Sequence, residues 1–240
     1  RDGSILFDDA SVWTPEGLAK LHQVFVASPD EGERSFIDKY RDQVKPSGQA
    51  VIRLAAEMLC VYFLFPSNVG GYRKRELVSE VLGWGGDSLP AEHAVSLAFE
   101  KGIGGCGQGY NTRRPFEIAF LIEFAIAWKQ LTDAERTEAL GDPWKFQARV
   151  DAVEGAEARQ IRHMLLHLVF PDDFERIASG HHKRRVLAAF DGLVSEPPAN
   201  DDQHLLAVRR ELEKLLPNKK LDFYWPPLEA AWYDDTEAGT

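Results

Sequence analysis

Apolar residues recur at three- and four-residue spacing along most of this chain, and this periodicity restricts its fold more than any other feature. In residues 49–65 it places Ile52, Leu59 and Phe63 on one side of a helix. The strict alternation that is typical of half-buried strands is almost absent. The sequence therefore predicts an all-α fold, an irregular arrangement of several helices joined by loops rich in glycine and proline.

Capping residues, prolines and glycines mark where these helices should begin and end. Thr132 and Glu135, for example, have the spacing of a capping box. We expect helices over residues 16–26, 28–44, 49–65, 74–82, 90–100, 116–128, 132–140, from 143 onward, 161–169, 181–190 and 205–216. Residues 102–109 should form a glycine-rich loop, and the prolines at 226 and 227 prevent residues 221–227 from being helical throughout.

The length of 240 residues is enough for one large domain or two small ones. We interpret residues 1–233 as a single helical module, with a subdivision near 130–150, and residues 234–240 as a linker. No apolar run is long enough to cross a bilayer, and the first residues do not resemble a signal peptide. Two cysteines exclude a disulfide framework. These features predict a cytoplasmic protein without a membrane partner.

Residues 161–190 contain the densest group of positive charges in an otherwise acidic chain. A helix ends at Phe170-Pro171, and a second helix begins with His181, His182, Lys183, Arg184 and Arg185. Cations at the start of a helix are unfavourable against its dipole. A bound phosphate is one explanation for their presence.

Two other helix starts carry similar basic residues, and we expect the three groups to converge into one phosphate-binding surface. The predicted nucleic-acid-binding residues are Tyr72, Arg73, Lys74, Arg75, Tyr110, Arg113, Arg114, His182, Lys183, Arg184 and Arg185. The net charge of −10 argues against a general coating of nucleic acid, so any contact must come from such a local patch. The alternative is that these residues lie on separate solvated faces and form surface ion pairs.

The loop at residues 102–107 matches G-x-G-x-x-G, but a helix rather than a strand precedes it, which argues against a dinucleotide site. A loop whose amides face a phosphate beside Arg113 and Arg114 is another reading, and a simple turn between helices is the third. No phosphate-binding P-loop sequence occurs in the chain.

Other candidate chemistry is weakly supported. His163 and His167 stand four residues apart but lack the glutamate of the zinc-protease motif. Cys106 lies among glycines, with only Arg113 and Arg114 nearby to activate its thiol. No serine lies in a G-x-S-x-G turn. We therefore predict no catalytic residue, no metal site and no cofactor in this chain.

Three segments, residues 170–177, 182–184 and 222–227, together resemble the region ahead of the AAA+ motor in McrB-like ATPases. These ATPases belong to modification-dependent (type IV) restriction systems and related phage-defence operons. Residues 110–115 and 142–144 resemble the same region, and the resemblance covers residues 35–233. This chain departs from such proteins because it contains no P-loop, no Walker B strand and no assignable arginine finger.

The resemblance implies a non-catalytic N-terminal module that senses a target in a larger nucleotide-hydrolysing protein. Its partners would be DNA, modified DNA included, the motor domain of the same chain and a nuclease subunit. The alternative is a protein-interaction module that couples the motor to a partner subunit. Its docking surface would be the aromatic tail Phe223, Tyr224, Trp225, Trp232 and Tyr233.

Overall fold

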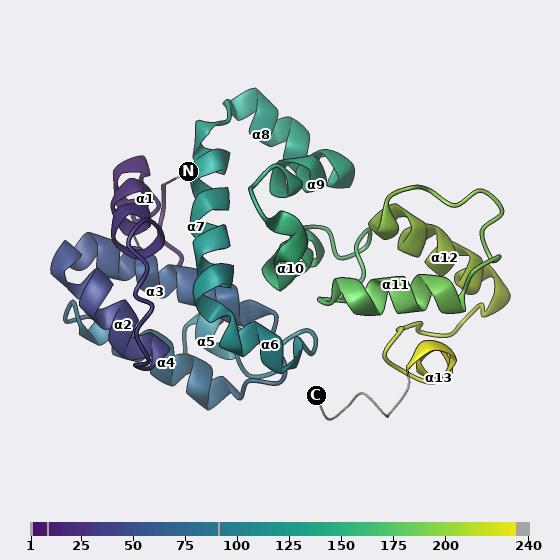
Figure 1. Ribbon diagram of the computed structural model, residues 1–240, viewed down its shortest axis with the longest axis horizontal. Coiled ribbons are helices and arrows are strands. Elements are labelled where there is room, and N and C mark those ends of the chain that lie inside the picture. Colours follow the sequence, from purple (N-terminus) through teal and green to yellow (C-terminus); the bar gives the residue numbers. More distant parts are fainter. Residues whose placement is uncertain (1, 9, 91, 234–240) are drawn as a thin grey trace. The chain divides into compact units, whose positions relative to one another are not determined.

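The computed structural model describes residues 2–8, 10–90 and 92–233 (Figure 1). These residues form thirteen α-helices and a few short turns of π- or 3-10 helix. The same residues contain no strand, and their only β contacts are two isolated bridges, between Gly3 and Ser11 and between Pro66 and Gly104. The predicted all-α fold is therefore confirmed. Within this described part, the helices are too short or too polar to cross a membrane.

The chain separates into two compact units, Arg1–Arg162 (unit 1) and His163–Thr240 (unit 2). The boundary falls inside one helix, α10 (Gln160–Val169), and not near residues 130–150. Residues 133–151 belong to unit 1, and Asp151 receives hydrogen bonds of 2.6 and 2.8 Å from the guanidinium of Arg162, the last residue of that unit. The predicted linker, residues 234–240, lies outside the described residues.

Unit 1 is built around α3, which contacts α1, α2, α4 and α7. Its helices are α1 (Pro15–Leu21), α2 (Phe36–Val44), α3 (Gln49–Leu64), α4 (Gly71–Gly83), α5 (Ala94–Ala98), α6 (Gly107–Thr112), α7 (Arg114–Gln130), α8 (Asp133–Leu140) and α9 (Pro143–Asp151). We expected α3 to bury one face, but none of its residues after Ala50 is exposed. The α3 helix also contacts α5, and a helix enclosed by five others must be apolar on all sides, as the run from Met58 to Leu64 is.

One buried carboxylate in α3 fixes the segment that precedes α1. Glu57 is fully buried and accepts hydrogen bonds from the Ser4 hydroxyl, the Ile5 N–H at 2.9 Å and the Trp13 indole. A buried carboxylate is stable only when such donors surround it. Residues 2–8 and 10–13 are therefore anchored across the central helix.

Most helix starts have the capping groups that the sequence predicts. Thr14 accepts the Gly17 N–H, and Asp142 accepts the N–H groups of the first turn of α9. Thr132 and Glu135 form both hydrogen bonds of the capping box at α8. Caps of this type each stabilise a helix by about 0.5–2 kcal/mol.

Some helices begin at other residues than predicted, and two helices were not predicted at all. The α5 helix begins at Ala94 and not at Pro90, because His93 Nδ1 caps it by accepting the Val95 N–H. Two short helices were not predicted, α6 within the glycine-rich segment and α13 (Glu229–Trp232). Glycine has a low helix propensity, so the glycines of α6 argue against a helix there, and α13 is too short to show helical periodicity.

Unit 2 contains α11 (Gly180–Ala189), α12 (Asp201–Leu215) and α13, together with most of α10. Both α12 and α13 contact α11. Val186, Leu205, Val208, Phe223 and Trp232 belong to its hydrophobic core. The unit therefore has a core of its own, to which residues after the last long helix contribute.

Candidate functional site

The first basic cluster lies at the start of α4, and its two arginines are already paired with carboxylates. Arg73 forms an ion pair with Glu76, and Arg75 forms one with Glu100. Tyr72 beside them is 73% exposed. Exposed ion pairs contribute little to stability, so a phosphate could displace these carboxylates at small cost.

Lys74, the middle residue of this cluster, is buried and does not face solvent. Its ammonium donates a hydrogen bond to the carbonyl of Pro66 and lies 5.8 Å from the ring of Phe99. Burial lowers the pKa of Lys74. Lys74 precedes Leu77 and Val78 by three and four residues, so helical spacing already placed it on the buried face. Its burial removes Lys74 from the predicted binding residues.

The second basic cluster also combines exposed and buried side chains. Tyr110 is buried against Tyr62, with ring centroids 4.3 Å apart and planes 6° from parallel. Each of these two hydroxyls donates to the other residue's carbonyl, at 2.9 and 3.1 Å, so Tyr110 is structural and not available for base stacking. The guanidinium of Arg114 lies over the rings of Phe36 and Tyr62, whereas Arg113 is exposed.

The third basic cluster belongs to unit 2, and its central residue is buried. Lys183 is 2% exposed and donates to Asp202, which is 3% exposed. The Lys183 ammonium also lies 2.9 Å from Nδ1 of His163. Arg184 is exposed and Arg185 is half-buried. Lys183 is therefore removed from the predicted binding residues, for the same reason as Lys74.

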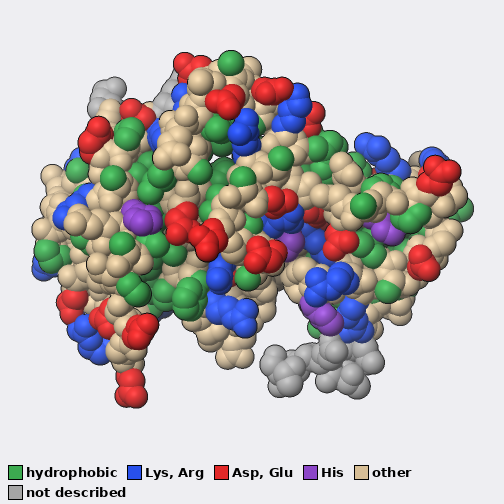
Figure 2. Space-filling view, turned by 45° about the horizontal axis from the view of Figure 1, so that its top comes forward, with side chains coloured by type: hydrophobic (Ala, Val, Ile, Leu, Met, Phe, Trp, Pro, Cys, Tyr) green, Lys and Arg blue, Asp and Glu red, His purple; other side chains and the backbone are tan. Residues whose placement is uncertain are grey.

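Of the eleven predicted residues, the exposed ones are Tyr72, Arg73, Arg113 and Arg184. Two of the basic clusters lie in unit 1 and one in unit 2, and their convergence stays a prediction. Figure 2 shows Lys and Arg side chains interspersed with Asp and Glu on the face that it draws. Neighbouring charges of opposite sign weaken the attraction that such a face can exert on a polyanion.

The glycine-rich loop is held against the end of α3, and two of its amides are engaged there. The N–H groups of Ile103 and Gly104 both donate to the carbonyl of Phe65, at 2.7 and 3.1 Å. Gly102 has a φ of +62°, and a Cβ there would lie 2.4 Å from a backbone carbonyl oxygen. The loop is thus a tight structural turn, the third of the readings considered above.

The histidine and cysteine candidates have structural partners as well. His167 Nδ1 lies 2.7 Å from the carbonyl of Phe174. Cys106 is buried, donates to Asn68 Oδ1 at 3.0 Å and has a pKa raised to about 11 by burial. A thiol with that pKa is a poor nucleophile at neutral pH. Among the described residues, no group of three or more His, Cys, Asp or Glu side chains could hold a metal ion.

The aromatic tail, which we expected to be a docking surface, is largely folded onto α11. Phe223 and Trp232 are buried, and Tyr224 places its hydroxyl 2.9 Å from Nδ1 of His182. Trp225 is 48% exposed and is the most exposed ring of the tail. The tail thus completes the core of unit 2, and this role corrects the expectation that its five rings form an open surface.

A groove between α2 and α7 is a concave site of unit 1 that sequence reasoning missed. It has a volume of about 530 Å³, and Phe25, Pro29, Phe36, Phe116 and Phe120 belong to its walls. Phe25 and Phe120 are buried, whereas Phe116 is 60% exposed. An exposed phenylalanine in the wall of an apolar hollow makes this groove the candidate binding site of unit 1.

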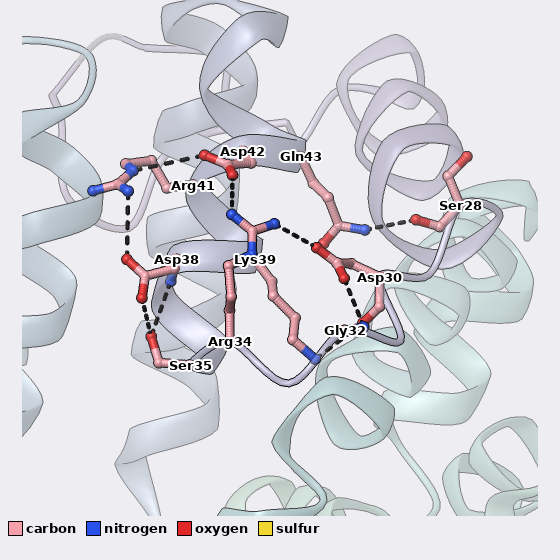
Figure 3. A network of polar contacts seen from close by, with 10 residues as sticks. All are labelled: Ser28, Asp30, Gly32, Arg34, Ser35, Asp38, Lys39, Arg41, Asp42 and Gln43. Atoms are coloured by element: carbon pink, nitrogen blue, oxygen red, sulfur yellow. Dashed lines mark hydrogen bonds and ion pairs between the residues drawn. The ribbon is translucent and has the colours of Figure 1, made fainter.

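A polar network holds the loop between η1 (His22–Val26) and α2 at one edge of this groove (Figure 3). Arg34 reaches Asp30 at 2.9 Å and Asp42 on α2. The side-chain amide of Gln43 donates to the carbonyl of Ser28 at 2.6 Å. These bonds tie both ends of the loop to one helix, so the edge is formed before any ligand arrives.

A buried carboxylate holds the opposite edge. Glu117 on α7 accepts the N–H groups of Gln160 at 3.3 Å and of Ile161 at 2.9 Å, and so caps the start of α10. Burial raises the pKa of Glu117, while the two hydrogen bonds lower it less. The segment fixed in this way carries Arg159, whose guanidinium lies 5.3 Å from the centre of the Phe116 ring.

Three segments far apart in the sequence therefore build one groove with an apolar interior and a charged edge. This arrangement suits the binding of apolar side chains from another molecule. Compared with models of protein families, with curated proteins and with solved structures, the chain matches none of them.

Proposed function

We propose that this chain is a non-catalytic helical module that binds another protein through unit 1. The observation that carries the proposal is the groove between α2 and α7, where Phe116 is exposed within an apolar wall. Aromatic side chains in such positions supply most of the binding energy of protein interfaces. The net charge of −10 suits a protein partner better than a polyanion.

The resemblance to the region ahead of the motor in McrB-like ATPases fits this proposal as a coupling module. Its partner would then be the motor domain or a nuclease subunit, and nucleotide hydrolysis would belong to the motor. This assignment rests on the resemblance alone, whereas the binding role rests on the groove.

DNA binding is the second candidate function, and one observation favours it. Arg113 and Arg184 are exposed and form no ion pair within the described part of the chain. Tyr72 is exposed enough to stack on a base. The buried Lys74, Tyr110 and Lys183 take no part in this version of the site.

One pair of experiments separates the two functions. A photo-crosslinking phenylalanine analogue replaces Phe116 in cells that make the protein, with the same analogue at Leu97 as the control. Leu97 is 64% exposed and does not line the groove. We expect a discrete protein adduct from position 116 and none from position 97.

The second experiment titrates a fluorescent DNA duplex with the protein at two salt concentrations. The proposal predicts no saturable binding at either concentration. Saturable binding that weakens steeply with salt, together with no protein adduct at position 116, would establish the DNA-binding alternative instead.

A further inference from the structure

The inner surface of the groove is apolar, and its size suits side chains of a partner protein. A cavity of about 150 Å³ is large enough to hold a benzene ring. The volume of about 530 Å³ therefore leaves room for two or three apolar side chains. Because the ring of Phe116 is 60% exposed, the groove is open to solvent, and its occupant can remain attached to a larger body.

The edge formed by the loop before α2 is held by hydrogen bonds and ion pairs within the chain. Lys39 donates to the carbonyl of Asp30 at 3.1 Å, and Arg34 pairs with the Asp30 carboxylate. The pKa of Asp30 is lowered, mainly by the hydrogen bond from the Gly32 N–H and further by Arg34. A preformed edge reduces the entropy that a ligand must overcome on binding.

The remaining charges of the groove are negative. Glu31, Glu123 and Glu154 line it and form no hydrogen bond or ion pair within the described residues. The two cations of the lining are both engaged, Lys39 with a carbonyl and Arg159 with the Phe116 ring. Three uncompensated carboxylates around an apolar hollow favour a ligand that carries positive charge next to apolar groups.

We infer that the groove binds a segment of a partner protein in which apolar side chains are flanked by Lys or Arg. The apolar side chains enter between α2 and α7, and the cations meet Glu31, Glu123 and Glu154. This inference rests on the proposed function, because it names the partner chemistry of the same site.

A display library of random linear peptides, selected on the full chain, tests the inference. The enriched peptides are then titrated by fluorescence anisotropy against the wild type and three variants. Phe116→Ser removes the exposed ring, Leu97→Ser is its matched control, and Glu123→Gln with Glu154→Gln removes two carboxylates. Melting temperatures of all variants establish that each is folded.

We expect the enriched peptides to combine apolar residues with net positive charge. Their affinity should be equal for the wild type and Leu97→Ser, and about tenfold or more weaker for Phe116→Ser. The double carboxylate variant should weaken binding several-fold at low salt and less at high salt, because exposed charges are screened.

Each other result overturns a defined part of the inference. Peptides that bind Phe116→Ser as tightly as the wild type place the peptide site outside the groove and refute the inference, and the crosslink at position 116 then decides the proposed function separately. Enriched peptides without positive charge refute the partner chemistry. A concentration-dependent dimer that Phe116→Ser abolishes would make a second copy the occupant. If no peptide is enriched, the inference fails, whereas the proposed function fails only if position 116 also gives no protein adduct.

Discussion

The buried ion pair between Lys183 and Asp202 provides the sharpest test of how unit 2 is held together. Both side chains are almost fully buried, at 2% and 3% exposure, and the ammonium also contacts His163. The substitution Asp202→Asn keeps the shape of the side chain but removes its charge. The ammonium of Lys183 would then remain buried without the negative charge of Asp202.

The expected loss follows from this burial. Removing one partner of a buried ion pair costs about 3–5 kcal/mol, because the other charge is left without compensation. Asp202 also lies in the first turn of α12, where a negative charge contributes a further ~0.3–1 kcal/mol. A small domain is stable by only ~5–15 kcal/mol, so we expect Asp202→Asn to remove a large part of the stability of unit 2.

Native-state hydrogen exchange of the amides in α11 and α12 measures this loss within unit 2 itself. The matched control is Glu211→Gln, which breaks an exposed ion pair with Lys214 in the same helix. That change should cost less than about 1 kcal/mol. The double variant Lys183→Met with Asp202→Leu should recover most of the lost stability, because an apolar pair replaces the buried charges.

The reasoning is refuted if Asp202→Asn and Glu211→Gln change the free energy of opening by the same small amount. Such a result would mean that water solvates Lys183 as it does a surface lysine. A double variant that is as unstable as the single one would show instead that shape, not charge, determines the effect.

Three further perturbations have defined outcomes. Burial raises the pKa of the Glu117 carboxyl group above its ordinary value of 4.5, so ionisation of this group destabilises the folded state as the pH rises above 4.5. The free energy of unfolding of Glu117→Gln, measured by urea denaturation, should therefore increase relative to that of the wild type as the pH rises. Gly102→Ala should lower the melting temperature, because a Cβ would lie 2.4 Å from the Pro66 oxygen, whereas Gly105→Ala, with nothing within 4 Å, should not. Tyr110→Phe should lose about 1 kcal/mol in urea denaturation, because it removes one buried hydrogen bond, and should leave any DNA titration unchanged.

Local rules predicted much of the fold. Apolar spacing and caps such as Thr132 and Asp142 act within one turn of a helix, so a reading of the sequence finds them. They predicted the all-α class and most of the helices. Short helices and exact ends depend on distant contacts, as the stacking of Tyr110 on Tyr62 shows for α6.

The burial of two lysines could not be predicted from charge alone. Lys74 and Lys183 stand in basic runs that resemble solvated surface, yet each ammonium finds an acceptor inside the fold. For Lys183 that acceptor is Asp202, 19 residues further along the chain. Neither partner was identifiable without the folded arrangement.

The groove was beyond sequence reasoning for a related reason. Its wall residues Pro29 and Phe116 and its edge residue Arg159 come from three segments, and none of these segments alone has a binding motif. The one local signal was the apolar character of residues 116–128, which exceeds what a single buried face requires.

Hydrogen exchange of the full chain, measured alone, with a selected peptide and with a DNA duplex, distinguishes protein binding at the groove from DNA binding. We expect the peptide to slow exchange in residues 29–43 and 115–123, which contain most of the groove's lining, and DNA to slow exchange nowhere. Protection by DNA at residues 72–75, 113–114 and 182–185, with no protection of the groove by the peptide, would contradict this expectation.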